Sequence, residues 1–198
     1  MRGGMRRGGP GGFYSPESFG EVVRGVWLSP GSFFRRLDPD GGPLRPALFA
    51  AIVMYLNLIL GELLQSLWNL EFDRALLYAA LPGFVVSLVL APLLVVGLSV
   101  LVLTVLDGAP SRRKLGPVFR GLCYWTAIGV VLWVPYAPLL AVPYSLYVAT
   151  IAVKEVLFVS WERAAAAALA PLGALLLTLL LLTGPNEILQ LLVNPPGS

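Results

Sequence analysis

Four polar side chains stand inside or at the ends of long apolar runs, and they are the first candidates for chemistry: Asn57, Glu62, Lys154 and Glu155. Ionisable groups inside a membrane are costly and mark the paths of ions and substrates, so together they would suit a transport pathway. Each also has a simpler explanation. Asn57 can hydrogen-bond a neighbouring helix, Glu62 can reach water at a helix end, and Lys154 can extend to the lipid headgroups. Glu155 needs water or a partner, for which Arg120 is the candidate.

The residue types on which most enzymes depend are missing. There is no histidine, which removes the commonest metal ligand and the usual general base. The single cysteine, Cys123, lies in an apolar run where it suits packing, and one cysteine without histidine does not make a zinc or haem site. No phosphate-binding loop, dinucleotide fingerprint or Ser/His pairing is present either. The sequence therefore predicts no catalytic residue, no metal, no cofactor and no enzyme.

The elements that hold these side chains are predicted to be transmembrane helices. The chain has 198 residues, of which 57% are hydrophobic and 13% charged, and its mean hydropathy is +0.79. A soluble domain has about 25% charged residues. Charges are absent from 75–106, 121–153 and 164–186, and each of these runs is longer than the about 20 residues that cross a bilayer. The predicted fold class is all-α, a polytopic transmembrane helical bundle.

The run 121–153 decides the number of spans. As one helix it would be about 50 Å long, whereas the hydrocarbon core is about 30 Å thick. Pro135, Pro138 and Pro143 lie near its middle, and prolines break helices, so the run divides into two spans joined by a tight turn. The five predicted spans are 47–67, 81–106, 116–134, 138–158 and 164–182.

The positions of Lys and Arg predict the orientation. Seven arginines precede the first span, and the third and fifth connections are also basic. The second connection holds one arginine among three acids, the fourth has no charge, and the tail after Leu182 has no Lys or Arg. Because basic connections stay on the cytoplasmic side, we expect a multi-pass protein of the inner (plasma) membrane. Its N-terminus would be cytoplasmic and its C-terminus outside.

The segments around the predicted bundle differ in composition. Residues 1–14 are mostly Gly and Arg and are expected to be a disordered tail. Residues 15–45 are predicted to form short amphipathic helices at the cytoplasmic membrane surface, the first starting near Ser15. Residues 46–183 would be the five-helix domain, and 184–198 a short outer tail.

A series of short motifs follows the order of the spans. They are LSPGSFFR at 28–35, Phe119, Tyr124 and Pro135 around the third span, Pro143 and Tyr147 in the fourth, and Lys154-Glu155 with Arg163-Ala164 before the last. Over about residues 26–183 the chain resembles the Yip (Ypt-interacting protein) domain family, bacterial type, although it lacks the His that commonly follows the fourth span. The resemblance implies five helices and a cytoplasmic N-terminus. The GTPase binding of eukaryotic relatives does not carry over, because the part before the first span is short and rich in Gly and Arg.

Two functions fit these observations. The first is a non-enzymatic scaffold that binds other membrane proteins or a second copy of itself, and binds anionic phospholipid through basic residues. The candidate headgroup contacts are Arg35, Arg36, Arg112, Arg113 and Lys114. The alternative is a small-solute or lipid transporter or a permease subunit, which proline-containing spans with polar residues favour, although no polar stripe runs along any span. Nucleic acid is not an expected partner, because the basic residues suit lipid headgroups better.

Overall fold

The computed structural model describes residues 18–38, 41–69 and 74–171. Within these residues the regular structure is helical and no strand is present, which confirms the all-α prediction. The elements are α1 (Phe19–Leu28), α2 (Pro30–Arg36), α3 (Leu44–Asn69), α4 (Arg74–Asp107), α5 (Arg112–Trp125), the 3-10 helix η1 (Thr126–Val131) and α6 (Ala137–Leu157). A further helical stretch covers residues 161–171.

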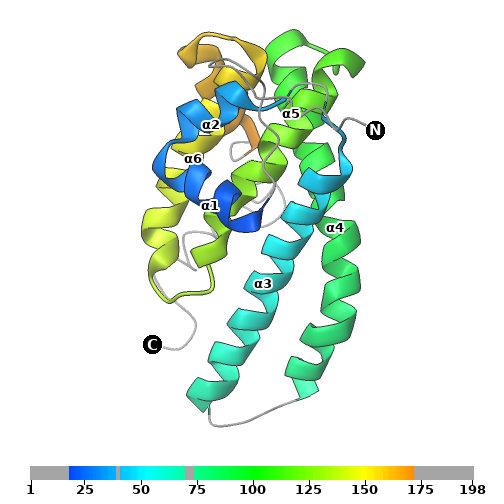
Figure 1. Ribbon diagram of the computed structural model, residues 1–198, viewed down its shortest axis with the longest axis vertical. Helices are drawn as coiled ribbons and strands as arrows, with labels where there is room; N and C mark the ends of the chain where they lie inside the picture. The colour runs from blue at the N-terminus through cyan, green and yellow to red at the C-terminus, as the bar shows by residue number, and fades with distance from the viewer. Residues whose placement is uncertain (1–17, 39–40, 70–73, 172–198) are drawn as a thin grey trace, which may run out of the picture.

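The long helices pack as two antiparallel pairs. α3 packs along α4 and α5 along α6, and α3 and α4 extend beyond the α5–α6 pair at one end of the bundle (Figure 1). The short helices α1 and α2 lie across α5 and α6 (Figure 1). We call the opposite end, where α2, the start of α5 and the end of α6 meet, the basic end of the bundle.

Among the described residues, three helices are long and apolar enough to cross a membrane: Leu44–Trp68, Pro82–Asp107 and Ala137–Leu157. They match the first, second and fourth predicted spans. The fifth predicted span, 164–182, begins inside the helical stretch 161–171, and its remainder lies outside the described residues. The count of five spans and the orientation of the termini therefore stay predictions.

The third predicted span, 116–134, is not one regular α-helix. α5 has 14 residues, which is about 21 Å, and the chain then tightens into the six-residue helix η1. The η1 sequence is rich in β-branched residues, which lose side-chain freedom in an α-helix. A Cβ added to Gly129 would lie 3.2 Å from Val53, so the missing side chain lets η1 approach α3 closely.

Two hydrophobic cores hold the bundle together. The first joins α3, α4, α5 and the stretch 161–171, and Leu103, Cys123 and Ala164 are completely buried in it. The small side chain of Ala164 lets this stretch pack closely against the bundle. The second core joins α1, α2, the start of α3, η1 and α6 around Val26. The two short helices are therefore part of the folded bundle.

Candidate functional site

The first helix starts later in the chain than the sequence predicts. Ser18, and not Ser15, is the residue that caps α1 at Phe19. The Ser18 hydroxyl accepts a hydrogen bond from the Glu21 N–H at 3.3 Å, and the Ser18 N–H donates to the Glu21 carboxylate at 3.4 Å. This capping box needs an acid three residues after the serine, and that spacing holds for Ser18 and Glu21.

The apolar face of α1 contacts protein. Val22 and Val26 are buried in the second core. The Trp27 ring nitrogen donates to the carbonyl of Ala127 in η1 at 3.1 Å. The Tyr144 hydroxyl of α6 donates to the Trp27 carbonyl at 2.7 Å, and the two rings stack with centroids 5.4 Å apart. Much of the face that the sequence offers to the membrane is therefore covered by η1 and α6.

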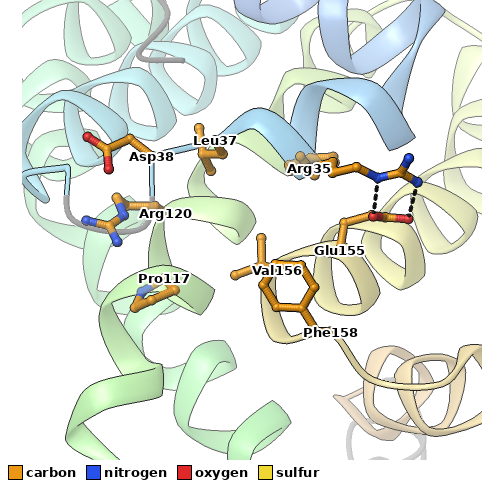
Figure 2. A pocket seen from close by; sticks show the side chains of 9 residues that line it. Arg35, Leu37, Asp38, Pro117, Arg120, Glu155, Val156 and Phe158 are labelled. Carbon is orange, nitrogen blue, oxygen red and sulfur yellow. Dashed lines mark hydrogen bonds and ion pairs between the residues drawn. The ribbon is translucent and has the colours of Figure 1, made fainter. Parts of the chain in front are cut away.

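The end of α2 is joined to the end of α6 by an ion pair. Arg35 donates to both carboxylate oxygens of Glu155, at 2.9 and 3.1 Å (Figure 2). The Glu155 side chain is 11% exposed and that of Arg35 66%. This carboxylate raises the pKa of the Arg35 guanidinium, chiefly through the hydrogen bond. The prediction that Arg120 is the partner of Glu155 is wrong. α2 folds back along α6, and this places Arg35 next to Glu155.

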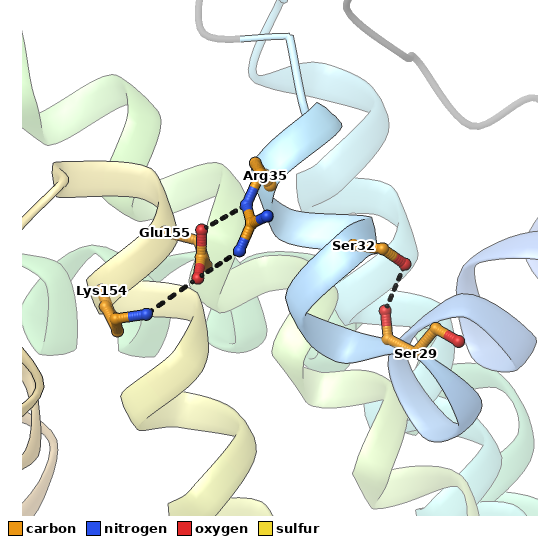
Figure 3. A network of polar contacts seen from close by, with 5 residues as sticks. All are labelled: Ser29, Ser32, Arg35, Lys154 and Glu155. Carbon is orange, nitrogen blue, oxygen red and sulfur yellow. Dashed lines mark hydrogen bonds and ion pairs between the residues drawn. The ribbon is translucent and has the colours of Figure 1, made fainter. Parts of the chain in front are cut away.

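The same carboxylate also binds a second cation. Lys154 Nζ donates to the same carboxylate at 3.1 Å (Figure 3), although adjacent helix positions do not normally face each other. At the other end of α2, the Ser32 hydroxyl donates to the Ser29 carbonyl at 3.0 Å (Figure 3). One acid thus holds two cations from different helices, and the pair Arg35–Glu155 joins residues 120 positions apart.

A small pocket of about 110 Å³ opens between α2, α5 and α6 at this point. Its wall carries charges of both signs, Arg35 and Glu155 on one side and Asp38 and Arg120 on the other (Figure 2). The Arg120 side chain comes from α5 and is almost completely buried. Apolar residues complete the lining: Phe34, Leu37, Pro117, Val156 and Phe158. The pocket is large enough for a small polar group, which the charged walls would orient.

Phe158 ends α6 in an unusual conformation. Its φ is +54°, in the left-handed region that favours glycine, and its side chain is 85% exposed. Tyr136, at the other end of α6, has φ +65° and is equally exposed. Each residue costs about 1–2 kcal/mol of backbone strain. The two aromatic side chains therefore stand out from opposite ends of α6, where rings suit the membrane boundary.

The five predicted headgroup contacts divide into two groups. Arg35 is engaged by Glu155, and Lys114 Nζ contacts Asp107 at 2.8 Å across the α4–α5 turn. Arg36, Arg112 and Arg113 are exposed and make no ion pair within the part of the chain that the structure describes. These three arginines are the cations that remain available to an external anion.

The four predicted intramembrane polar residues do not gather into one site. Asn57 donates from its amide to the Val53 carbonyl of its own helix at 2.9 Å, and its buried amide oxygen has no hydrogen-bond partner. Glu62 is half-buried farther along α3. Lys154 and Glu155 lie together near the end of α6. The structure therefore brings the last two together, as the sequence order suggests, and leaves Asn57 and Glu62 apart from them.

Some residues of the site carry no distinctive signal in the sequence. Trp27 and Tyr144 join α1 to α6, yet each is an aromatic residue at a position where packing is the ordinary expectation. The bond between Arg35 and Glu155 depends on how α2 folds back, which periodicity does not encode. The only available hint was a carboxylate at membrane depth that needed a partner.

One of the comparisons with known proteins gives a match. No curated protein and no solved structure matches the chain. The model of the Yip1 domain matches residues 24–182, which include α2 to α6 and the second half of α1. The three apolar helices are those of an integral membrane protein. Because the match covers most of its length, the chain belongs to the Yip1 domain family of integral membrane proteins.

Proposed function

We propose that the protein is a non-enzymatic scaffold of the inner (plasma) membrane, which binds anionic phospholipid at its basic end and holds other membrane proteins or a second copy of itself. Membership of the Yip1 domain family supports a membrane role without catalysis. The exposed arginines of the basic end support the lipid contact. The exposed apolar faces of the span helices supply surface for protein partners within the membrane.

The observation that carries the proposal is the charge at the start of α5. Its first turn contains Arg112, Arg113 and Lys114 and no acid. The N-terminus of a helix carries partial positive charge, so cations there destabilise it by about 0.3–1 kcal/mol each. Asp107 offsets one of the three. Anionic headgroups would neutralise the other two, and each cation near an anionic surface contributes about 1 kcal/mol of attraction.

The N-terminal helices place a further cation in the same region. Arg36 ends α2, which packs on α6 at the basic end. Its neighbour Arg35 is turned toward Glu155, so the two adjacent arginines have different roles. Arg36 is exposed and complements the cations of α5. Arg35 fixes α2 in the position from which Arg36 can reach a headgroup.

Lipid co-purification tests the proposal. The protein is reconstituted in mixed vesicles of neutral and anionic phospholipid, extracted in mild detergent, and its bound lipids are quantified by mass spectrometry. The double variant R112Q/R113Q should lower the enrichment of anionic lipid by about tenfold. The matched control R24Q/R45Q removes the same charge from two exposed arginines outside this turn and should have a smaller effect. Equal enrichment in all three proteins would contradict the proposal.

A further inference from the structure

A second cavity differs in character from the charged pocket at the basic end. It is an apolar groove of about 320 Å³ between α4, α5, α6 and the stretch 161–171. Its two polar side chains are already bonded. The Trp125 ring nitrogen donates to the Ser145 carbonyl at 2.7 Å, and the Ser145 hydroxyl donates to the Val142 carbonyl at 2.7 Å. Within the described lining, the side chains therefore offer a polar ligand no unused donor.

The groove is closed at one end and open at the other. Val102, Leu122 and Val153 form its floor and are at most 2% exposed. Along α6 the exposure rises from this floor to Val142, which is 48% exposed, and then to Leu139 at 73%. The mouth is thus continuous with an exposed apolar surface, and the buried floor lies nearer the basic end.

The groove runs along the middle of the α6 span. Val142 and Val153 are 11 positions apart on α6, which corresponds to about 16 Å of helix. The span is Ala137–Leu157, so Val142 lies five residues from one end of it and Val153 four residues from the other. The groove therefore lies at the depth of the hydrocarbon chains, with its two ends on either side of the middle of the span.

We propose that this groove binds one acyl chain of a membrane phospholipid, with the methyl end toward Val153 and the ester end toward Val142. Apolar cavities of about 150 Å³ stay dry and take up apolar molecules, and this groove has about twice that volume. The mouth opens onto the exposed apolar residues Val142 and Leu139 of α6, and in an integral membrane protein phospholipid is the apolar molecule that meets such a surface. An unfilled groove would leave its lining without dispersion contacts.

The shape of the groove determines which acyl chain binds in it. Lipid tails outside the groove are as apolar as its lining, so transfer from water contributes nothing. The closed floor limits the length of chain that enters, and the bonded Trp125 and Ser145 keep the wall apolar. Among the described residues, the site shares no lining residue with the charged pocket, so the proposal does not depend on the proposed scaffold function.

Photolabelling tests the proposal without anionic lipid. The protein is reconstituted in phosphatidylcholine vesicles that contain a small fraction of phosphatidylcholine with a diazirine at the end of one acyl chain. After irradiation, labelled peptides are mapped by mass spectrometry. We expect label at Val102, Leu122 and Val153. The variant A149F fills the groove at a buried lining position. It should lower this label about tenfold, because the ring and an acyl chain cannot occupy the groove together without a steric clash.

The control is L140F, on the same helix at a position that is 80% exposed. It should leave the floor label unchanged, since lipid accommodates the larger ring. If A149F does not fold, V142W blocks the mouth and should give the same loss. Label confined to exposed positions such as Leu139, with none on the floor, would overturn the proposal.

Two other occupants of the groove, residues 172–182 of the same chain and a second copy of the protein, are tested by disulfide formation in a C123A background. Residues 172–182 follow Pro171 directly and are apolar. Rapid intramolecular bonds between V142C and cysteines introduced at 172–182 would mean that this segment fills the groove. A disulfide-linked dimer of V142C alone would mean that a second copy does. Either result overturns the lipid proposal, and neither bears on anionic-lipid enrichment at the basic end.

Discussion

α4 and α6 are both long apolar helices with internal proline, yet they have different surroundings. In an 18-residue stretch of the α4 span, Pro82–Asp107, the mean hydropathy is 2.8 and 28% is buried inside the protein, whereas in an 18-residue stretch of the α6 span, Ala137–Leu157, the mean hydropathy is 1.4 and 44% is buried. In a soluble protein the more apolar helix would be the more buried one. Here lipid receives the apolar side chains, and protein contacts admit small and polar residues. The less hydropathic helix is the one that makes the specific contacts.

The hydrogen bonds of the two helices show the same contrast. Within α4, Ser99 and Thr104 donate to the carbonyls one turn back in their own helix. The bonds of α4 to other elements, at Leu106 and Asp107, lie in its last turn. α6 bonds three other elements along its length: Tyr144 contacts α1, the Ser145 carbonyl accepts from α5, and Glu155 holds α2. We therefore expect changes on the packed face of α6 to disturb the fold and changes on the exposed face of α4 to leave it intact.

Overpacking should give the largest difference between the helices. A152F places a ring at a position of α6 that is 1% exposed, and it should lower the free energy of unfolding by about 3 kcal/mol. L94F on α4, where the side chain is 58% exposed, should change it by less than about 0.5 kcal/mol. Denaturant unfolding in mixed micelles measures both. Similar losses for the two variants would remove the contrast.

The ion pairs at the ends of α6 and α4 should differ in how much they contribute to the free energy of unfolding, and this is the second-largest expected effect. R35Q and E155Q should each lower the free energy of unfolding, because the Glu155 carboxylate is largely buried and its bond to Arg35 is bidentate. A double-mutant cycle should return a favourable coupling energy between the two residues. The pair Lys114–Asp107, which is local and more exposed, should contribute less, about 0.5 kcal/mol in K114Q. A coupling energy near zero for Arg35 and Glu155 would show that α2 is held by its apolar contacts alone.

The sequence is sufficient for the features that apolar runs and prolines encode. It predicts the all-α class and the helices of α3, α4 and α6, because a bilayer requires long uncharged segments. It does not predict η1, where β-branched residues and Gly129 make a close approach to α3 possible. The sequence does not predict the charged pocket either. Many Lys and Arg residues could pair with Glu155, and only the tertiary packing of α2 on α6 brings Arg35 to it.

The hydroxyl of Tyr144 should have a smaller, local effect. Y144F keeps the ring stacked on Trp27 but removes the hydrogen bond to its carbonyl, and should cost about 1 kcal/mol. Hydrogen exchange of the α1 amides should become faster, because α1 opens more often. Y147F is the matched control, since the described contacts of Tyr147 are ring contacts. Unchanged exchange in α1 would mean that Val22 and Val26 hold it without this bond.

The end of α6 should give the smallest change, in the opposite direction. F158G relieves a left-handed backbone that costs about 1–2 kcal/mol, but glycine loses about 0.5–1 kcal/mol more conformational entropy on folding. The balance is a stabilisation of about 0.5–1 kcal/mol, provided that the exposed ring contributes little in micelles. F158A removes the same ring without relieving the backbone, so it should not stabilise. If F158G and F158A both destabilise the protein in vesicles but not in micelles, the ring anchors this end of α6 at the membrane boundary and outweighs the strain.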